Sequence, residues 1–171
     1  MGVRGIIEQS NVRLICTTDD PIDDLRYHKQ LREDPSCKVK VLPAWRPDRA
    51  MNIEQPFYAD YLRQRSGLSG VEVSDFGSLC AALSNRLDYF AQNGCCASDH
   101  APDCAFYCPA PREKLDRIIA DALSGKPVSD EDVRNYKTEF LLFLGRQYAK
   151  RGWVMQLHFG AVRNTNSRRF A

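Results

Sequence analysis

The sequence predicts an α/β fold in which short parallel strands alternate with amphipathic helices. Apolar stretches at residues 12–16, 38–42, 95–97 and 153–159 each lead into a turn rich in polar residues. The segments between them carry apolar residues at helical spacing. Strands separated by helices are parallel neighbours joined by right-handed crossovers. The polar turns are therefore expected to lie together at the carboxyl ends of the strands.

The first strand, residues 12–16, follows a helix expected over residues 2–10 and precedes the turn T-T-D-D at residues 17–20. Asp20 and Pro21 then predict the start of a helix. Aspartate is a favoured N-cap, and proline suits the first helical position.

The second strand, residues 38–42, leads into P-A-W-R-P-D at residues 43–48. Two helices are expected after it, one near residues 55–64 and one that begins at Ser74. Asn93-Gly94 ends the second helix, as a left-handed cap does.

The third strand, residues 95–97, runs into Ser98-Asp99-His100, and the helix after it ends at Ser124-Gly125. Ser129 caps the next helix in a weak form of the capping box. That helix stops at Gly152, and the fourth strand, residues 153–159, leads into the final polar segment. No glycine-rich phosphate loop follows any strand, which disfavours a nucleotide-binding fold.

The composition excludes several classes of partner. With 24 basic and 22 acidic residues among 171, the net charge is +2, which gives no electrostatic basis for binding nucleic acid. No apolar run approaches the roughly 20 residues that a membrane-spanning helix needs. We therefore expect a cytoplasmic protein that binds neither nucleic acid nor membrane.

The seven cysteines do not predict a disulfide framework, because their number is odd and no C-x2-C pair is present. Cys104 and Cys108 form a C-x3-C downstream of His100, so a zinc site is a weaker alternative. Free cysteines that pack as small apolar residues are the favoured interpretation.

The polar residues at the strand ends are the candidate functional residues. A site that combines guanidinium and imidazole groups suits an anionic substrate, because arginine binds a carboxylate through two parallel hydrogen bonds. Imidazole titrates near neutrality, so the histidines are candidates for proton transfer or metal binding. The four strand ends offer Thr17-Thr18-Asp19-Asp20, Trp45-Arg46, Asp99-His100, and His158 with Arg163-Asn164.

Each histidine also has a structural interpretation. His158 alternates with apolar neighbours in M-Q-L-H-F, which is typical of a buried histidine as much as of a catalytic one. His100 can cap a turn together with Asp99. His28 lies within an expected helix and is interpreted as a surface or packing residue.

The other candidates have structural alternatives as well. Arg46 lies between Trp45 and Pro47, where it can stack on the indole ring. N-capping accounts for Asp20, which leaves Asp19 as the freer carboxylate of the first turn. Pattern alone therefore supports a polar cleft without naming a reaction.

Four segments resemble the uronate (glucuronate) isomerases. I-C-T-T-D-D-P-I-D-D-L-R-Y-H at residues 15–28 is similar to the T-T-D-D-P segment of that family, and V-L-P-A-W-R-P-D at 41–48 to its next strand. G-C-C-A-S-D-H-A at 94–101 resembles the strand after that. R-G-W-V-M-Q-L-H-F-G-A-V-R-N-T-N at 151–166 resembles the Q-x-H-x-G-A-x-R-x-x-N signature. The four matches keep their order over nearly the whole chain.

The resemblance implies a single β/α domain over residues 1–171 that forms about half of a (β/α)8 TIM barrel of the amidohydrolase superfamily, strands two to five. It implies aldose–ketose isomerisation of D-glucuronate to D-fructuronate and of D-galacturonate to D-tagaturonate. His158 and His100 would be the catalytic residues. Binding of the uronate would fall to the following residues: Arg46, Arg163, Asp19, Trp45 and Asn164.

The family's metal-binding His-x-His has no counterpart, since the sequence contains no H-x-H, and the late metal-binding aspartate is also absent. The resemblance therefore covers a central section only. It implies a divalent metal such as zinc in the full-length enzyme, with His158 as a neighbour, and no complete metal site in this chain. We expect the isolated chain to be inactive.

Two other functions remain as alternatives: a metal-dependent hydrolase of the same superfamily and a non-catalytic folded fragment. A closed barrel of this kind takes about 250 residues. Half a barrel leaves strand edges unpaired at the first and fourth strands, so we expect self-association through these edges.

Overall fold

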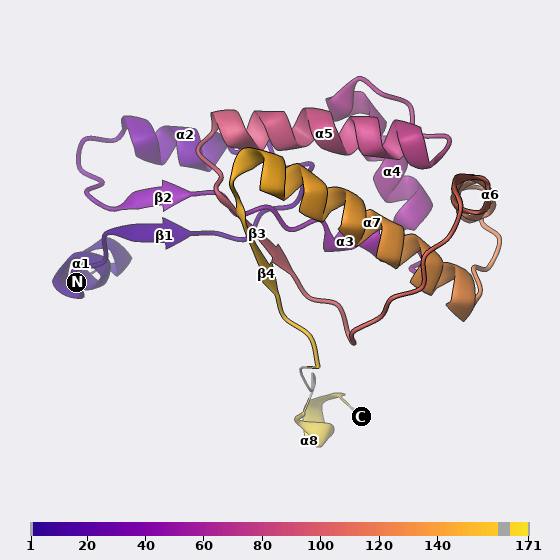
Figure 1. Cartoon of the computed structure of the whole chain (residues 1–171). Coiled ribbons are helices and arrows are strands. Elements are labelled where there is room, and N and C mark those ends of the chain that lie inside the picture. Colours follow the sequence, from indigo (N-terminus) through magenta and orange to yellow (C-terminus); the bar gives the residue numbers. More distant parts are fainter. Residues whose placement is uncertain (1, 161–164, 171) are drawn as a thin grey trace.

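The computed structural model describes residues 2–160 and 165–170, without the side chains of 64–69, 167 and 170. Helices and strands alternate along the described chain (Figure 1). The elements are α1 (Val3–Gln9), β1 (Leu14–Cys16), α2 (Arg26–Glu33), β2 (Lys40–Leu42), α3 (Asp48–Met51), α4 (Tyr58–Ser69), α5 (Phe76–Gln92), β3 (Ala97–His100), α6 (Arg112–Leu123), α7 (Asp130–Arg151), β4 (Val154–Leu157) and α8 (Ser167–Phe170).

The strands pair in parallel, β1 with β2 and β3 with β4. Trp45, three residues beyond β2, joins the two pairs through bridges to Asp19 and Ser98. Its N–H donates to the carbonyl of Ala97 at 3.0 Å, and its carbonyl accepts from the N–H of Asp99 at 2.8 Å. The described strands are thus linked in the order β1-β2-β3-β4, and their carboxyl ends point the same way.

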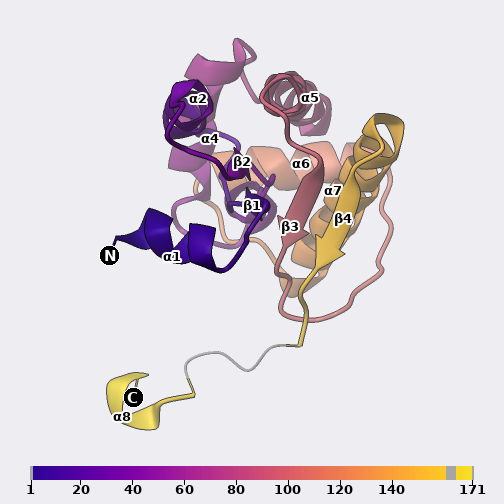
Figure 2. The same ribbon diagram turned by 90° about the vertical axis from the view of Figure 1, so that its left-hand side faces the viewer.

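Helices cover one side of these strands. Figure 2 shows α2, α5 and α7 on that side, and the buried apolar residues form one cluster between them and the strands. Phe140 and Leu144 of α7 and Leu83 and Leu87 of α5 are completely buried within it. Burial of a phenylalanine or leucine side chain contributes about 1.5–3 kcal/mol, so this layer carries much of the stability. No helix in the described ranges has the length and apolarity to span a membrane.

The turn after β1 differs from its prediction. The helix expected at Asp20-Pro21 begins instead at Arg26. Asp20, Asp23 and Asp24 each accept a hydrogen bond from the backbone N–H two residues ahead, at 2.7–3.1 Å. Such local bonds compete with the helical pattern. Leu25 adopts a left-handed conformation with φ of 54°, and the helix starts only after it.

The other helix boundaries follow the predicted signals more closely. Ser129 caps α7 by accepting a hydrogen bond from the Asp132 N–H, and Gly152 ends the helix at φ of 65°. Gly94, at φ of 90°, follows the C-cap of α5, as predicted. The capping residue of α5 is Asp75, one residue beyond the predicted start. The short helices α3 and α8 were not predicted, because a single turn has no periodicity to detect.

β3 also differs from its prediction. The strand spans Ala97–His100 rather than residues 95–97, so Asp99 and His100 belong to it instead of to the turn after it. Adjacent residues of a strand point to opposite faces. Because β3 extends through His100, the side chains of Asp99 and His100 point to opposite faces, although the sequence predicts both in one turn.

Candidate functional site

The candidate site is built around Asp99, at the carboxyl end of β3. Asp99 stands in register with Gln156 of β4, and its N–H donates to the carbonyl of Trp45. Its two carboxylate oxygens face different partners. Oδ2 accepts from Nη1 of Arg46 at 3.0 Å, while Oδ1 lies 3.0 Å from Nε2 of His158. One side chain thus connects groups that follow β2 and β4.

Arg46 is held between two carboxylates. Its Nε donates to Oδ2 of Asp48 at 2.8 Å, on the side opposite its bond to Asp99. The hydrogen bond with Asp48 raises the pKa of Arg46, and the charge of Asp99 adds to the effect. The backbone N–H of Arg46 donates to the carbonyl of Asp19 at 2.9 Å. The guanidinium is therefore oriented and permanently charged, yet 30% of its side chain remains exposed.

His158 lies just beyond the end of β4. Its N–H donates to the carbonyl of His100 at 2.8 Å, which extends the β3–β4 pairing by one bond. Its side chain is 51% exposed, so the interpretation as a buried structural histidine is wrong. The Gln156 amide, on the same face of β4, also contacts Nε2 of the imidazole. His158 has both a fixed orientation and access to solvent.

Asp19 forms a buried structural cluster with residues from two other elements. Only 8% exposed, it accepts hydrogen bonds from the Ala44 N–H at 3.2 Å and from the Thr17 hydroxyl. Nε2 of His28, on α2, lies 2.7 Å from the same hydroxyl oxygen and 3.7 Å from Oδ1 of Asp19. The expectation that Asp19 is the freer carboxylate is therefore wrong, and the packing interpretation of His28 is confirmed.

Asp20 is the other carboxylate of this turn, and its contacts are also structural. Its Oδ1 accepts from the Ile22 N–H and from the hydroxyl of Tyr61 at 2.8 Å. It fixes the turn after β1 instead of capping a helix.

His100 and Trp45 lie on the side of the strands that the helices cover, and both are completely buried. Nε2 of His100 lies 3.0 Å from the hydroxyl of Tyr148 on α7, and the Trp45 ring packs edge-on against Phe90 at 5.0 Å. Burial lowers the pKa of His100 to about 4. Neither side chain has surface with which to contact a substrate, which corrects the expectation for both. Stacking of Arg46 on the indole is excluded as well, because the ring is enclosed.

Two predicted residues, Arg163 and Asn164, lie outside the described residues. The sequence placed Asp99 among the polar residues at the strand ends without a binding role, and it left out Asp48 and Gln156, although the structure joins all three to Arg46 or His158. Two signals could have found them. A partly buried arginine needs a carboxylate partner, and residues two apart on a strand share a face.

The arrangement combines a fixed cation with an imidazole that faces a carboxylate. Arg46 retains exposed surface that can bind an anion, and the carboxylate of Asp99, 3.0 Å from Nε2 of His158, can balance the charge of that imidazole when the ring holds a proton. No three His, Cys, Asp or Glu side chains among the described residues converge as metal ligands. Cys104, proposed as part of the weaker zinc alternative, is exposed, and Cys108 contacts the Asn135 amide.

The family model described as glucuronate isomerase matches residues 1–171. Among curated proteins, the uronate isomerase of Lachnospira eligens is 49% identical over 170 residues, and that of Pectobacterium carotovorum is 49% identical over 167. These alignments cover 99% and 98% of this chain and 36% of each relative. The chain thus spans little more than a third of the length of these relatives.

Solved structures show the same likeness. The uronate isomerase of Thermotoga maritima superposes with a TM-score of 0.90 at 29% identity, over 98% of this chain and 37% of that one. The glucuronate isomerase of Caulobacter crescentus gives a TM-score of 0.84 at 24% identity, over 96% and 34%, and supports the fold alone.

Proposed function

Because this chain belongs to the glucuronate isomerase family, we propose that it supplies the Arg46–Asp99–His158 part of a uronate isomerase active site. The reaction is the aldose–ketose isomerisation of D-glucuronate to D-fructuronate and of D-galacturonate to D-tagaturonate. The observation that carries the proposal is the linked set of Arg46, Asp99 and His158 at the carboxyl ends of neighbouring strands. Open α/β folds and barrels place their active sites at this edge.

Arg46 binds the carboxylate of the uronate in this proposal. Its exposed guanidinium surface offers donors in a fork that matches a carboxylate, and its bonds to Asp48 and Asp99 hold the fork in place. Arg163 and Asn164 are proposed to contact the carboxylate and the sugar hydroxyls from the segment after β4.

His158 transfers the proton between carbon atoms of the substrate in this proposal. Moving the carbonyl from C1 to C2 removes a proton from C2 and delivers one to C1. An imidazole can accept and return that proton, and the neighbouring carboxylate of Asp99 stabilises the imidazolium. Asp99 therefore positions His158 and balances its charge during transfer.

A divalent metal such as zinc is proposed for the full-length enzyme, where it would polarise the carbonyl. The residues that the structure describes do not fit a complete metal site. Asp48 and Asp99 each bind the guanidinium of Arg46, and among the described residues no three potential ligands come together. His158 would be a neighbour of that metal, and the remaining ligands would come from elsewhere in the enzyme.

We also propose that the chain forms one domain, about half of a (β/α)8 barrel, in a cytoplasmic enzyme. The sequential parallel order of the linked strands supports this, because a doubly wound sheet reverses its order where the ligand binds. Helices on one side of the strands support it too, since a barrel places its helices in an outer ring. The isolated chain is proposed to be inactive.

A chimera tests the proposed function. The matched 36% of the Lachnospira eligens uronate isomerase is replaced by this chain, and aldose–ketose isomerisation of D-glucuronate is compared with hydrolysis of ester and amide substrates. Isomerisation with no hydrolysis is expected. In the same chimera, Arg46→Lys should raise KM at least tenfold, because lysine cannot form the bidentate contact. A folded chimera that hydrolyses esters without isomerising uronates would overturn the proposal.

A further inference from the structure

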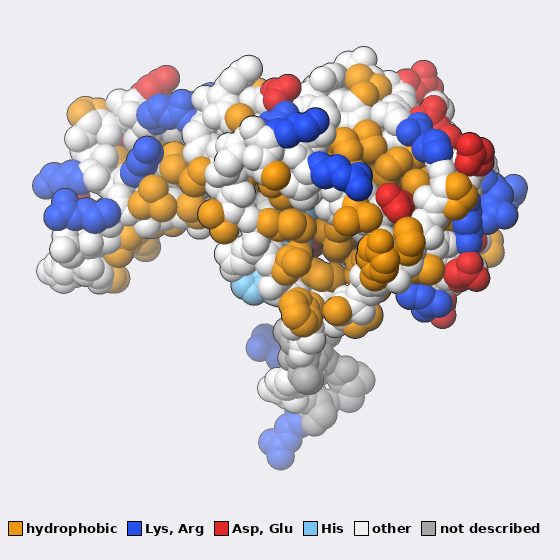
Figure 3. Space-filling model, in the orientation of Figure 1, with side chains coloured by type: hydrophobic (Ala, Val, Ile, Leu, Met, Phe, Trp, Pro, Cys, Tyr) orange, Lys and Arg blue, Asp and Glu red, His pale blue; other side chains and the backbone are white. Residues whose placement is uncertain are grey.

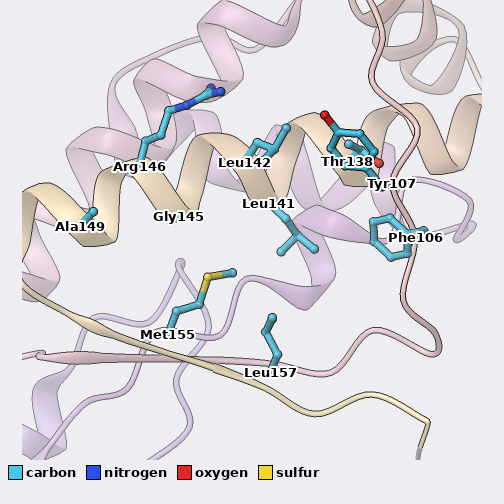
Figure 4. Close-up of a pocket in the computed structure, with 10 residues that line it drawn as sticks. All are labelled: Phe106, Tyr107, Thr138, Leu141, Leu142, Gly145, Arg146, Ala149, Met155 and Leu157. Carbon is cyan, nitrogen blue, oxygen red and sulfur yellow. The ribbon is translucent and has the colours of Figure 1, made fainter.

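Arg86 of α5 is a buried arginine outside the candidate site. Lys and Arg side chains are spread over the outside of the molecule (Figure 3). Figure 4 shows one of them, Arg146 of α7, extending away from Leu141 and Met155, which line an apolar groove of about 450 Å³. Arg86, in contrast, is only 8% exposed. Burial of a charged group is costly unless hydrogen bonds compensate it, so the partners of Arg86 indicate its role.

The guanidinium of Arg86 binds backbone carbonyls of the turn after β1. Its Nε donates to the carbonyl of Pro21 and its Nη2 to the carbonyl of Asp23, each at 2.7 Å. The rings of Tyr89 and Phe90 stabilise the charge by cation–π contact, with centroids 4.2 and 5.9 Å from the guanidinium carbon. One rigid, planar group thus holds two carbonyls that are two residues apart, which fixes the backbone of the turn.

Two tyrosines hold the same turn, residues 17–25. The hydroxyl of Tyr61, on α4, donates to Oδ1 of Asp20 at 2.8 Å. The hydroxyl of Tyr89, on α5, donates to the carbonyl of Asp24. Tyr61 is 1% exposed, so its bond is enclosed in the core. Side chains of the helix layer therefore fix the turn at several points.

The start of this turn binds the segment that carries Arg46. Asp19 makes three hydrogen bonds to that segment. Its N–H donates to the carbonyl of Ala44 at 2.9 Å, and its Oδ2 accepts from the Ala44 N–H at 3.2 Å. Its carbonyl accepts from the Arg46 N–H at 2.9 Å. The position of the Arg46 backbone thus depends on the turn as well as on the bonds of Trp45 to β3.

We propose that Arg86 is a positioning residue for Arg46 and acts through the turn at residues 17–25. The inference rests on the proposed function, in which Arg46 binds the carboxylate of the uronate. Arg86 lies in the helix layer and acts without touching the substrate. It fixes two carbonyls of the turn, the turn fixes Asp19, and Asp19 sets the position of the Arg46 backbone.

Loss of this positioning should weaken binding of the substrate carboxylate more than it slows the chemistry. Asp48 and Asp99, which orient the guanidinium of Arg46, lie on α3 and β3 and do not depend on the turn for their own position. A shift of the Arg46 backbone relative to them disturbs the bidentate contact, because a misplacement of about 1 Å is already harmful. A binding contact that is equal in the ground state and the transition state changes KM and leaves kcat as it was.

Arg86→Gln in the chimera tests the proposal by steady-state kinetics with D-glucuronate. KM should rise about fivefold while kcat stays within about twofold, because glutamine is neutral and too short to bind both carbonyls. In the Arg46→Lys background the same substitution should raise KM by less than about twofold, since the contact that it supports is already lost. The matched control is Arg112→Gln, which removes an arginine that links α6 to Asp75 instead of to the turn; KM and kcat should not change.

Amide hydrogen exchange of the chimera gives a second readout that needs no substrate. Arg86→Gln should speed exchange about fivefold or more in peptides that cover residues 17–25 and 43–48, and leave the peptide at 112–123 unchanged. A general loss of stability would speed exchange in all three. If Arg86→Gln does not fold, Tyr61→Phe removes the bond to Asp20 and should give the same pattern with a smaller amplitude.

Three results would each overturn the proposal: an unchanged KM in Arg86→Gln, additive effects of Arg86→Gln and Arg46→Lys on KM, or exchange that rises equally in all three peptides. Failure of the parent chimera to isomerise uronates would instead overturn the proposed function. In that case the exchange measurement alone still decides whether Arg86 holds the Arg46 segment.

Discussion

The two faces of β3 and β4 differ in what their side chains do. Asp99 and His158 face away from the helices and lie 3.0 Å apart; the imidazole is 51% exposed, whereas the Asp99 side chain is 14% exposed and also binds Arg46. His100, adjacent to Asp99 in the chain, faces the helices and is enclosed with Tyr148. Strand alternation therefore places neighbouring polar residues on opposite faces, one outside the helix-covered core and one enclosed in it.

The helix-covered face should dominate stability. Phe140→Ala removes a completely buried ring from α7 and is expected to lower the free energy of unfolding by about 3–5 kcal/mol. The matched control is Phe57→Ala, because that ring is 40% exposed; its effect should stay near 1 kcal/mol or below. Urea denaturation of both variants measures the difference. Equal effects would mean that the face is not the stabilising layer.

The open face should dominate turnover. In the chimera, His158→Gln removes the proton acceptor and is expected to lower kcat by about 10²–10⁴-fold. Its melting temperature should hardly change, because the imidazole is half-exposed. Steady-state kinetics and thermal melting together make the test. A kcat within twofold of the parent would exclude His158 as the proton carrier.

The buried histidine should make stability depend on pH. Burial lowers the pKa of His100 to about 4, below the unfolded value of about 6.5. The unfolded chain therefore binds a proton first as the pH falls. The contribution of neutral His100 to the free energy of unfolding is fully present above pH 6.5. It declines as the pH falls toward 4 and does not change further below that, with a total loss on the order of 3 kcal/mol.

His100→Gln should remove the part of the pH dependence of the free energy of unfolding that comes from His100. The pH dependence that comes from other groups should remain. Urea denaturation of both proteins at intervals between pH 7 and pH 4 measures it. An identical slope in the variant would show that His100 does not titrate between the two states as described.

The smallest effect is expected at Asp48. Asp48→Asn removes one of the two carboxylates that orient Arg46, but Asp99 remains. Partly exposed ion pairs contribute about 0.2–1 kcal/mol, so the free energy of unfolding should fall by no more than that. KM for the uronate in the chimera should rise a few-fold. A stability loss above about 2 kcal/mol would place Asp48 with the structural face instead.

Part of this division was predictable from the sequence. The four strand regions, the caps at Ser129 and Gly152 and the convergence of Arg46 with His158 follow from periodicity, capping preference and the parallel topology. These features depend on residues close in sequence or on a rule that holds for every parallel sheet.

The facing of individual side chains was not predictable. Whether Asp99 or His100 faces the helices depends on where β3 begins, and a shift of one residue reverses the assignment. The contact of Asp19 and Thr17 with His28 depends on where α2 packs, and no local sequence pattern predicts that position. The turn at Asp20 is set by competing side-chain hydrogen bonds, although its residues have the form of a helix cap.

The most direct test of the central claim is a crystal structure of the chimera with bound D-glucuronate. The sugar acid is expected on the open face, with its carboxylate within hydrogen-bond distance of Arg46 and a sugar oxygen or C2 next to His158. His100 should remain enclosed against Tyr148 without contact to the ligand. A uronate bound through the helix-covered face, or away from both Arg46 and His158, would rule out this role for the open face.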